Sequence, residues 1–101
     1  MNTLTFEVDP LAKQVKVTDD ELIVDLSDGR KMSVPLAWYP RLLNATLSER
    51  QHFELLGDGY AIEFPELDEH IGIEGLLAGR HSGESQRSFE KWLAARKKAN
   101  N

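Results

Sequence analysis

The chain of 101 residues contains no cysteine, and none of its apolar runs approaches the length of a membrane span. Without cysteine there is no disulfide framework, no thiolate metal site and no cysteine nucleophile. A membrane-spanning helix needs about 18 or more consecutive apolar residues. The opening stretch MNTLTFEVDP places Glu7 and Asp9 where a signal peptide would be basic or apolar. These absences exclude thiol chemistry and predict a cytoplasmic protein.

The remaining composition is typical of one small globular domain. Hydrophobic residues make up 41% of the chain and charged residues 29%, which is the balance of an ordinary water-soluble fold. A chain of this size buries only a small core, so an oligomeric interface would add stability. We predict a single domain over residues 1–80, followed by a linker and C-terminal helix over residues 81–101.

Charge is distributed unevenly along the sequence. Residues 1–83 carry 7 Lys and Arg against 15 Asp and Glu, whereas residues 84–101 carry 5 against 2, within a total net charge of −5. An acidic body repels a phosphate backbone, so direct nucleic-acid binding by the body is not expected. The basic tail could touch nucleic acid weakly or pair with an acidic partner. We expect a protein partner, and a second copy of the chain is also a candidate.

Alternating apolar residues predict three strands within residues 15–34. The alternating sets are Val15 and Val17, then Leu22, Val24 and Leu26, then Met32 and Val34. Asp28-Gly29 lies between the second and third set and predicts a hairpin with a type I′ turn, because Asp and Gly tolerate positive φ. Residues 4–8 alternate as well and predict a short additional strand that ends before Pro10.

The period changes after Pro40, which suits the first position of a short helix through Leu43. A second helix is predicted from residue 45 to 57, capped by Thr46 with Glu49 or by Ser48 with Gln51. Further along we expect strands at residues 60–64 and 71–73, a short helix that ends at Gly79, and a C-terminal helix over residues 85–98. The predicted fold class is α+β: a small, mainly antiparallel sheet packed with short helices, plus a C-terminal amphipathic helix.

The segment PLAWYPRLLNA, residues 35–45, has two interpretations. In the first, Trp38, Leu42 and Leu43 belong to the core, with Trp38 mostly buried. In the second, Trp38, Tyr39 and Arg41 form part of a partner surface, because these residue types are enriched among interface hot spots.

Two longer stretches resemble a known family. LSDGRKMSVPLAWYPRLLNAT and GDGYAIEFPELDEHIGIEGLLAG together resemble the bacterial domain-of-unknown-function family numbered 2442, over roughly residues 14–79. The resemblance implies an α+β fold and assigns no catalytic residue. Some relatives carry a helix-turn-helix domain after this module, and some are encoded beside another small protein in an apparent toxin–antitoxin pair. This chain departs from the family pattern at His70, where Asp is expected, and at Gly72, where Ser is expected.

Candidate chemistries are few. His52 and Glu54 match half of a zinc-deaminase signature, but the cysteine half is absent. The acidic turn of Glu66, Asp68, Glu69 and His70 is rich in oxygen ligands but lacks the spacing and central glycine of a calcium loop. We therefore predict no catalytic residue, cofactor or metal.

Two classes of function remain. The first is a non-catalytic protein-interaction module, antitoxin-like or a regulatory adaptor. The alternative is a small ligand- or metal-binding protein, or an enzyme, that uses the acidic turn around Asp68. On the C-terminal helix, Phe89, Trp92 and Leu93 form an apolar stripe that needs a packing partner, either the body or a second copy. The candidate partner surface comprises Trp38, Tyr39, Arg41, Asp68, Glu69, Phe89 and Trp92.

Overall fold

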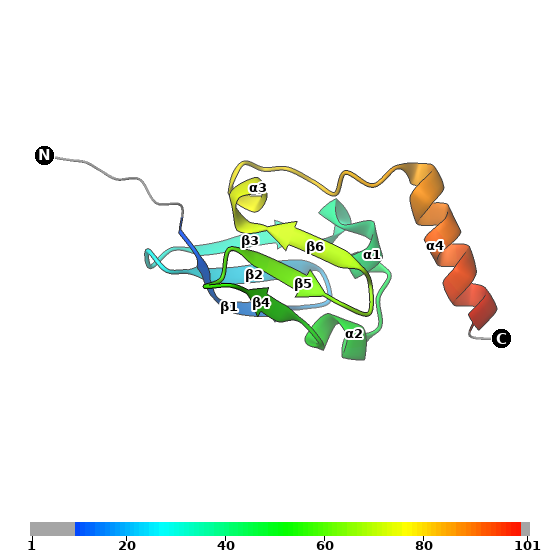
Figure 1. Cartoon of the computed structure of the whole chain (residues 1–101), viewed down its shortest axis with the longest axis horizontal. Helices are drawn as coiled ribbons and strands as arrows, with labels where there is room; N and C mark the ends of the chain where they lie inside the picture. The colour runs from blue at the N-terminus through cyan, green and yellow to red at the C-terminus, as the bar shows by residue number, and fades with distance from the viewer. Residues whose placement is uncertain (1–9, 100–101) are drawn as a thin grey trace, which may run out of the picture.

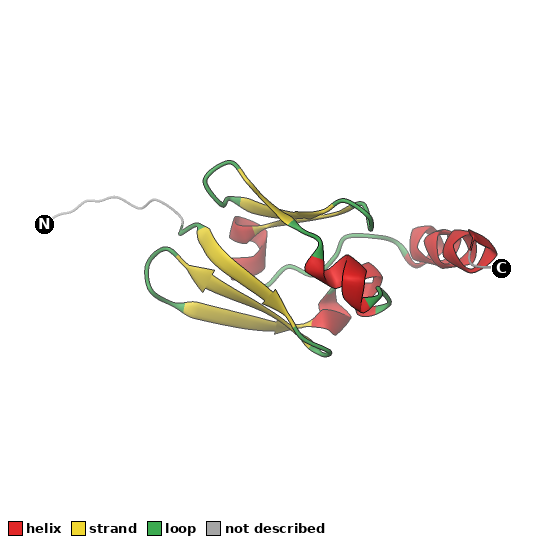
Figure 2. Cartoon of the chain, turned by 90° about the horizontal axis from the view of Figure 1, so that it is seen from below, coloured by secondary structure: helices red, strands yellow, loops and turns green. Residues whose placement is uncertain are grey.

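The computed structural model describes residues 10–99 and contains two small antiparallel sheets. The first sheet consists of β1 (Ala12–Val17), β2 (Glu21–Leu26) and β3 (Lys31–Pro35), in that order. The second consists of β4 (Glu54–Leu56), β5 (Ala61–Phe64) and β6 (Glu69–Gly72). Figure 2 shows the sheets as separate layers. The predicted α+β class is confirmed, with its strands divided between two sheets rather than gathered in one.

Apolar residues of both sheets meet in one core. Leu22 and Val24 of β2 and Ile62 and Phe64 of β5 are fully buried. Leu36 and Leu42, which follow the first sheet in the chain, join the same cluster. The alternation that predicted the strands therefore also identified their buried faces. The predicted strand at residues 4–8 lies outside the described residues.

The hairpin between β2 and β3 forms at Asp28-Gly29, but the predicted turn type is wrong. Gly29 has a φ of 95°, whereas Asp68 is the only non-glycine residue with positive φ in the described part of the chain. The Gly29 amide donates to the Leu26 carbonyl at 3.1 Å, and the Leu26 amide donates to the Arg30 carbonyl at 2.8 Å. This is a three-residue loop with a left-handed glycine in its last position, whereas a type I′ turn needs two positive φ angles.

Between the sheets the chain forms the 3₁₀ helix η1 (Leu36–Trp38) and two short α-helices, α1 (Pro40–Leu43) and α2 (Leu47–Gln51). Pro40 occupies the first turn of α1 as predicted, and Thr46 with Glu49 forms the predicted capping box of α2. The helix predicted through residue 57 is wrong beyond Gln51, because residues 54–56 form β4 and pair with β5. The three apolar residues at positions 53, 55 and 56 fit either period, and pairing with a buried strand decides between them.

The second half ends in two helices. α3 (Ile73–Leu77) follows β6 directly, and Gly79 with a φ of 78° lies just beyond it, as predicted. α4 (Gln86–Ala99) begins after Ser85, whose hydroxyl accepts a hydrogen bond from the Ser88 amide at 3.1 Å. Figure 1 shows α4 beyond α1 and α2, at one end of the molecule. Within residues 10–99, no helix combines the length and apolar character that crossing a membrane requires.

Candidate functional site

Arg41 in α1 connects three separate parts of the chain. Its Nε donates to both carboxylate oxygens of Glu84, at 2.9 and 3.0 Å, and its Nη1 donates to the Leu67 carbonyl at 2.8 Å. The Ser88 hydroxyl donates to the same Glu84 carboxylate at 2.6 Å. These hydrogen bonds, chiefly those from Arg41, lower the pKa of Glu84. We call this meeting point of α1, the 65–68 turn, the 80–85 linker and α4 the junction.

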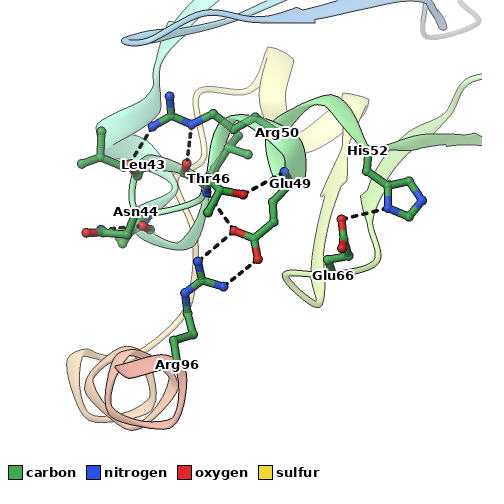
Figure 3. Close-up of polar contacts among 10 residues, drawn as sticks. Leu43, Asn44, Thr46, Glu49, Arg50, His52, Glu66 and Arg96 are labelled. Atoms are coloured by element: carbon green, nitrogen blue, oxygen red, sulfur yellow. Dashed lines mark hydrogen bonds and ion pairs between the residues drawn. The ribbon is translucent and has the colours of Figure 1, made fainter. Parts of the chain in front are cut away.

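A second ion pair fixes the other end of α4. The Arg96 guanidinium donates to both carboxylate oxygens of Glu49, each at 2.8 Å (Figure 3). Glu49 also accepts from the Thr46 amide at 2.8 Å, as the capping partner of α2. The hydrogen bonds from Arg96 are the main cause that lowers the pKa of Glu49 to about 2, against an opposing effect of burial. Both pairs are largely shielded from water and hold α4 against its own body.

Trp92 contacts two arginines. The Arg41 guanidinium carbon is 5.3 Å from the centre of a Trp92 ring and that of Arg96 is 4.5 Å away. Such distances fall in the cation–π range. Phe89 stacks on Trp92, with 5.9 Å between ring centroids, and both side chains are half-buried. The structure therefore brings three predicted surface residues together: Arg41, Phe89 and Trp92.

Trp38 and Tyr39 contact the linker from the body. Trp38 is half-buried, rather than mostly buried as predicted, and stacks on His81 with 4.1 Å between ring centroids. Tyr39 is only 4% exposed, and its hydroxyl donates to the Arg80 carbonyl at 3.2 Å. Burial, with a further contribution from Glu69, raises the pKa of Tyr39 to about 12. Tyr39 is therefore too deeply buried to contribute to the predicted partner surface.

The leucines after Pro40 separate into two environments. Leu42 is fully buried, as the core interpretation predicted, but Leu43 is 43% exposed. Its assignment to the core is therefore wrong. Adjacent residues of a helix point about 100° apart, and in α1 Leu42 points into the core whereas Leu43 points toward solvent.

The side chains of the acidic turn lie in different environments and do not converge on one point. Asp68 is exposed and has a φ of 52°, whereas Glu69 is buried and only 9% exposed. Glu69 is therefore not a residue of an exposed surface, contrary to prediction. Burial raises its pKa to about 7, and the nearby charge of Arg41 acts in the opposite direction. The signal for this burial was present in the sequence, because Glu69 alternates with Ile71 on the inner face of β6.

The two histidines near the turn have separate acidic partners. His52 Nδ1 lies 2.9 Å from Glu66, and His70 Nδ1 lies 3.0 Å from Glu63. Across residues 10–99, no three His, Cys, Asp or Glu side chains gather in a group that could hold a metal ion. The arrangement around Asp68 thus gives two exposed His–Glu contacts rather than one shared ligand set.

A groove runs beside the first half of α4. Its volume is about 510 Å³, and its lining consists of Arg41, Ser85, Arg87, Ser88, Lys91 and Trp92. Three of these residues are basic and none is acidic, so the groove suits an anionic group beside an aromatic face. The sequence did not single out Arg87, Lys91, Glu84 or the Glu49–Arg96 pair. No local pattern signals contacts between residues more than forty positions apart.

Comparison with known proteins identifies the family. A family model described as protein of unknown function (DUF2442) matches residues 12–82. The chain belongs to this family. The predicted resemblance is confirmed, and the matched region ends before Glu84 and α4.

Two solved structures share the DUF2442 fold of this chain. A crystal structure of a protein of unknown function from Rhodospirillum rubrum is 26% identical, with a TM-score of 0.68, over 78% of this chain and 98% of that one. A solution NMR structure of an uncharacterized protein from Chromobacterium violaceum is 22% identical, with a TM-score of 0.61, over 85% of this chain and 75% of that one. No curated protein matches the chain.

Proposed function

We propose that this DUF2442 protein is a non-catalytic protein-interaction module of the cytoplasm, in an antitoxin-like or regulatory role, and that it binds its partner through the groove beside α4. The observation that carries the proposal is the half-buried Phe89–Trp92 stack next to the basic side chains of Arg87 and Lys91. Aromatic and arginine side chains at a partly desolvated surface are the usual anchors of a protein interface.

The charge of the surroundings favours a protein over a nucleic acid. Residues 10–85 hold 14 Asp and Glu against 7 Lys and Arg, and residues 86–99 hold 1 against 5. A uniformly negative polymer that reached α4 would also meet the acidic body and be repelled. A protein with an acidic segment and a more basic flank would complement both parts.

The geometry around Asp68 supports a non-catalytic role. A catalytic or metal site requires several side chains to converge on one point. Here His52 and His70 instead pair with different glutamates, and the buried Glu69 forms a hydrogen bond with neither pair. This separation weighs against the alternative of an enzyme or metal protein built on the acidic turn.

A charge-reversal pair tests the proposal. The full-length wild type and Arg87→Glu/Lys91→Glu are each used to capture proteins from the native host, with quantification by mass spectrometry. The control, Lys97→Glu/Lys98→Glu, makes the same change of charge on the same helix, at residues that do not line the groove. The product of a neighbouring gene is the first candidate partner, in line with the family resemblance.

The expected result is a partner that binds the wild type and the control but binds the groove variant at least about tenfold more weakly, as measured by calorimetry with purified proteins. Equal binding by all three proteins would place the partner surface elsewhere. Light scattering of the free proteins shows whether the partner is a second copy, because the groove variant would then lose the dimer mass.

A further inference from the structure

Glu69 is a buried carboxylate with no hydrogen-bonding partner among residues 10–99. It is 9% exposed, and none of the side-chain hydrogen bonds or ion pairs in that part of the chain involves its oxygens. Leaving a buried carboxylate unpaired is costly, because it loses its hydration without receiving a compensating donor. A residue in this condition next to a cavity is a candidate binding group.

The nearest cation, Arg41, donates no hydrogen bond to Glu69 in this arrangement. Arg41 lies close enough to lower the pKa of Glu69. However, its Nε and Nη2 donate to Glu84, and its Nη1 donates to the Leu67 carbonyl. The guanidinium charge is thus matched by Glu84, and its three donor nitrogens are engaged away from Glu69.

A cavity of about 330 Å³ lies beside this carboxylate. Its lining includes Arg41, the three acidic residues Asp68, Glu69 and Glu84, and the hydroxyl-bearing residues Ser82 and Ser88. Once Glu84 has neutralised Arg41, Asp68 and Glu69 remain as two carboxylates without a matching cation. A smaller cavity of about 130 Å³, between β6, α3 and the linker, is also lined by Glu69.

We propose that the 330 Å³ cavity is a binding site for an organic cation, an ammonium or guanidinium group, which pairs with Glu69 and Asp68. Such a group supplies several N–H donors, which the two carboxylates need. A bare metal ion fits less well, because it requires ligands converging at short distance, and no group of three potential ligands exists within residues 10–99. This inference does not depend on the groove beside α4.

Proton linkage follows from the burial of Glu69. Its pKa of about 7 means that a bound cation, which favours the ionised carboxylate, displaces a proton near neutral pH. The groups that face Glu69 are Tyr39, Arg41, Glu63, Asp68 and Glu84, and the linker residues Arg80 and His81 line the smaller cavity with it. Affinity should therefore rise with pH, by about tenfold between pH 6 and pH 8, as the ionised fraction of Glu69 increases.

The test is an NMR titration of the full-length ¹⁵N-labelled protein with methylguanidinium chloride, with sodium chloride at the same concentration as the control for ionic strength. The amides of Asp68, Ser82 and Gly83 should shift saturably with methylguanidinium alone, and about tenfold more of it should be needed at pH 6 than at pH 8. Shifts that do not saturate, or that sodium chloride reproduces, would overturn the proposal.

Two variants make the test specific. Glu69→Gln should lose the saturable shifts, and Asp68→Asn, whose new side chain tolerates the positive φ at that position, should weaken them. Glu54→Gln is the matched control, because Glu54 is an exposed carboxylate outside the cavity. Wild-type affinity in Asp68→Asn and in a correctly folded Glu69→Gln would also reject the site.

A third titration distinguishes two sources of the cation. N-acetylarginine methylamide carries the guanidinium on a peptide-like backbone. If it binds as tightly as methylguanidinium, the site accepts an arginine side chain of a partner protein. If only methylguanidinium binds, the site is one for small free cations. Arg87→Glu/Lys91→Glu should bind both probes like the wild type, so failure here and failure of the proposed groove remain separate results.

Discussion

Arg96 in α4 donates two hydrogen bonds of 2.8 Å to Glu49, the same residue that caps the start of α2. One carboxylate thus joins a local helix cap to a contact across 47 positions of sequence. The stability of α2 and the docking of α4 are therefore coupled through a single side chain.

Acid should weaken this coupling. The pKa of Glu49 is lowered from its ordinary value of 4.5 to about 2, so its stabilising effect is present above pH 4.5 and lost as the pH falls toward 2. Glu49→Gln keeps a side chain that can serve in the capping box but removes the charge. We expect it to lower the free energy of unfolding by about 1 kcal/mol at pH 7.

Urea unfolding followed by circular dichroism at pH 7, 4 and 2.5 measures this effect. The difference between the wild type and Glu49→Gln should shrink as the pH falls, whereas Glu54→Gln, which changes an exposed residue of β4, should match the wild type at pH 7. A difference that stays constant down to pH 2.5 would mean that the ion pair contributes nothing.

Gly29 should be intolerant of β-branched residues. Its φ of 95° lies in the left-handed region, and an added Cβ would meet no atom within 4 Å, so any cost is backbone strain rather than a clash. Gly29→Val should destabilise by more than about 1 kcal/mol. Gly29→Asn is the control at the same position, because Asn accepts positive φ more readily. Equal melting temperatures for the glycine and valine proteins would contradict the observed loop.

Trp38 should contribute less to stability than its size suggests. It is half-buried against His81, whereas Leu42 is fully buried in the core. Leu42→Ala should cost about 2 to 5 kcal/mol, and Trp38→Ala about 2 kcal/mol, since only part of the ring leaves a protein environment. Thermal melting of both variants shows which substitution causes the larger loss of stability. A larger loss in Trp38→Ala would show that the contact with the linker contributes more than core packing at Leu42.

Truncation after Gly83 should leave a folded body of reduced stability. It removes Glu84, Trp92 and Arg96, and with them the Arg41–Glu84 and Glu49–Arg96 ion pairs, but it retains the whole region matched by the family model. We expect a lower melting temperature and, by light scattering, an unchanged oligomeric state. A loss of dimer mass would instead show that α4 packs on a second copy, and an unchanged melting temperature would show that α4 does not stabilise the body.

The sequence predicted elements where local chemistry decides the conformation. The capping box at Thr46, the helix start at Pro40 and the strand alternation in β2 all depend on residues a few positions apart. β4 was missed because its short apolar segment has no period of its own, and it becomes a strand only by pairing with β5. The exposure of Leu43 was missed because α1 is a single turn, which is too short for a helical period to show which of its residues face the core.

The candidate site could be predicted only in its parts. Arg41, Phe89 and Trp92 were recognisable as residue types that form interfaces, but their meeting requires contacts across the linker. Glu69 was assigned to an exposed acidic turn, and the alternation of β6 instead directs it inward. Whether a hydrogen-bond donor lies near the Glu69 carboxylate depends on residues that are distant in the sequence, so no local sequence pattern predicts it.

The chain contains two tryptophans, and both lie along the linker and α4 rather than deep in the core. Trp38 stacks on His81, and Trp92 contacts Arg41 and Arg96. Both rings also pack against the edge of the core, so a change in tryptophan fluorescence that precedes the loss of backbone signal reports release of the linker and α4. An optical signal and a backbone signal from the same sample can thus separate release of the helix from loss of the fold.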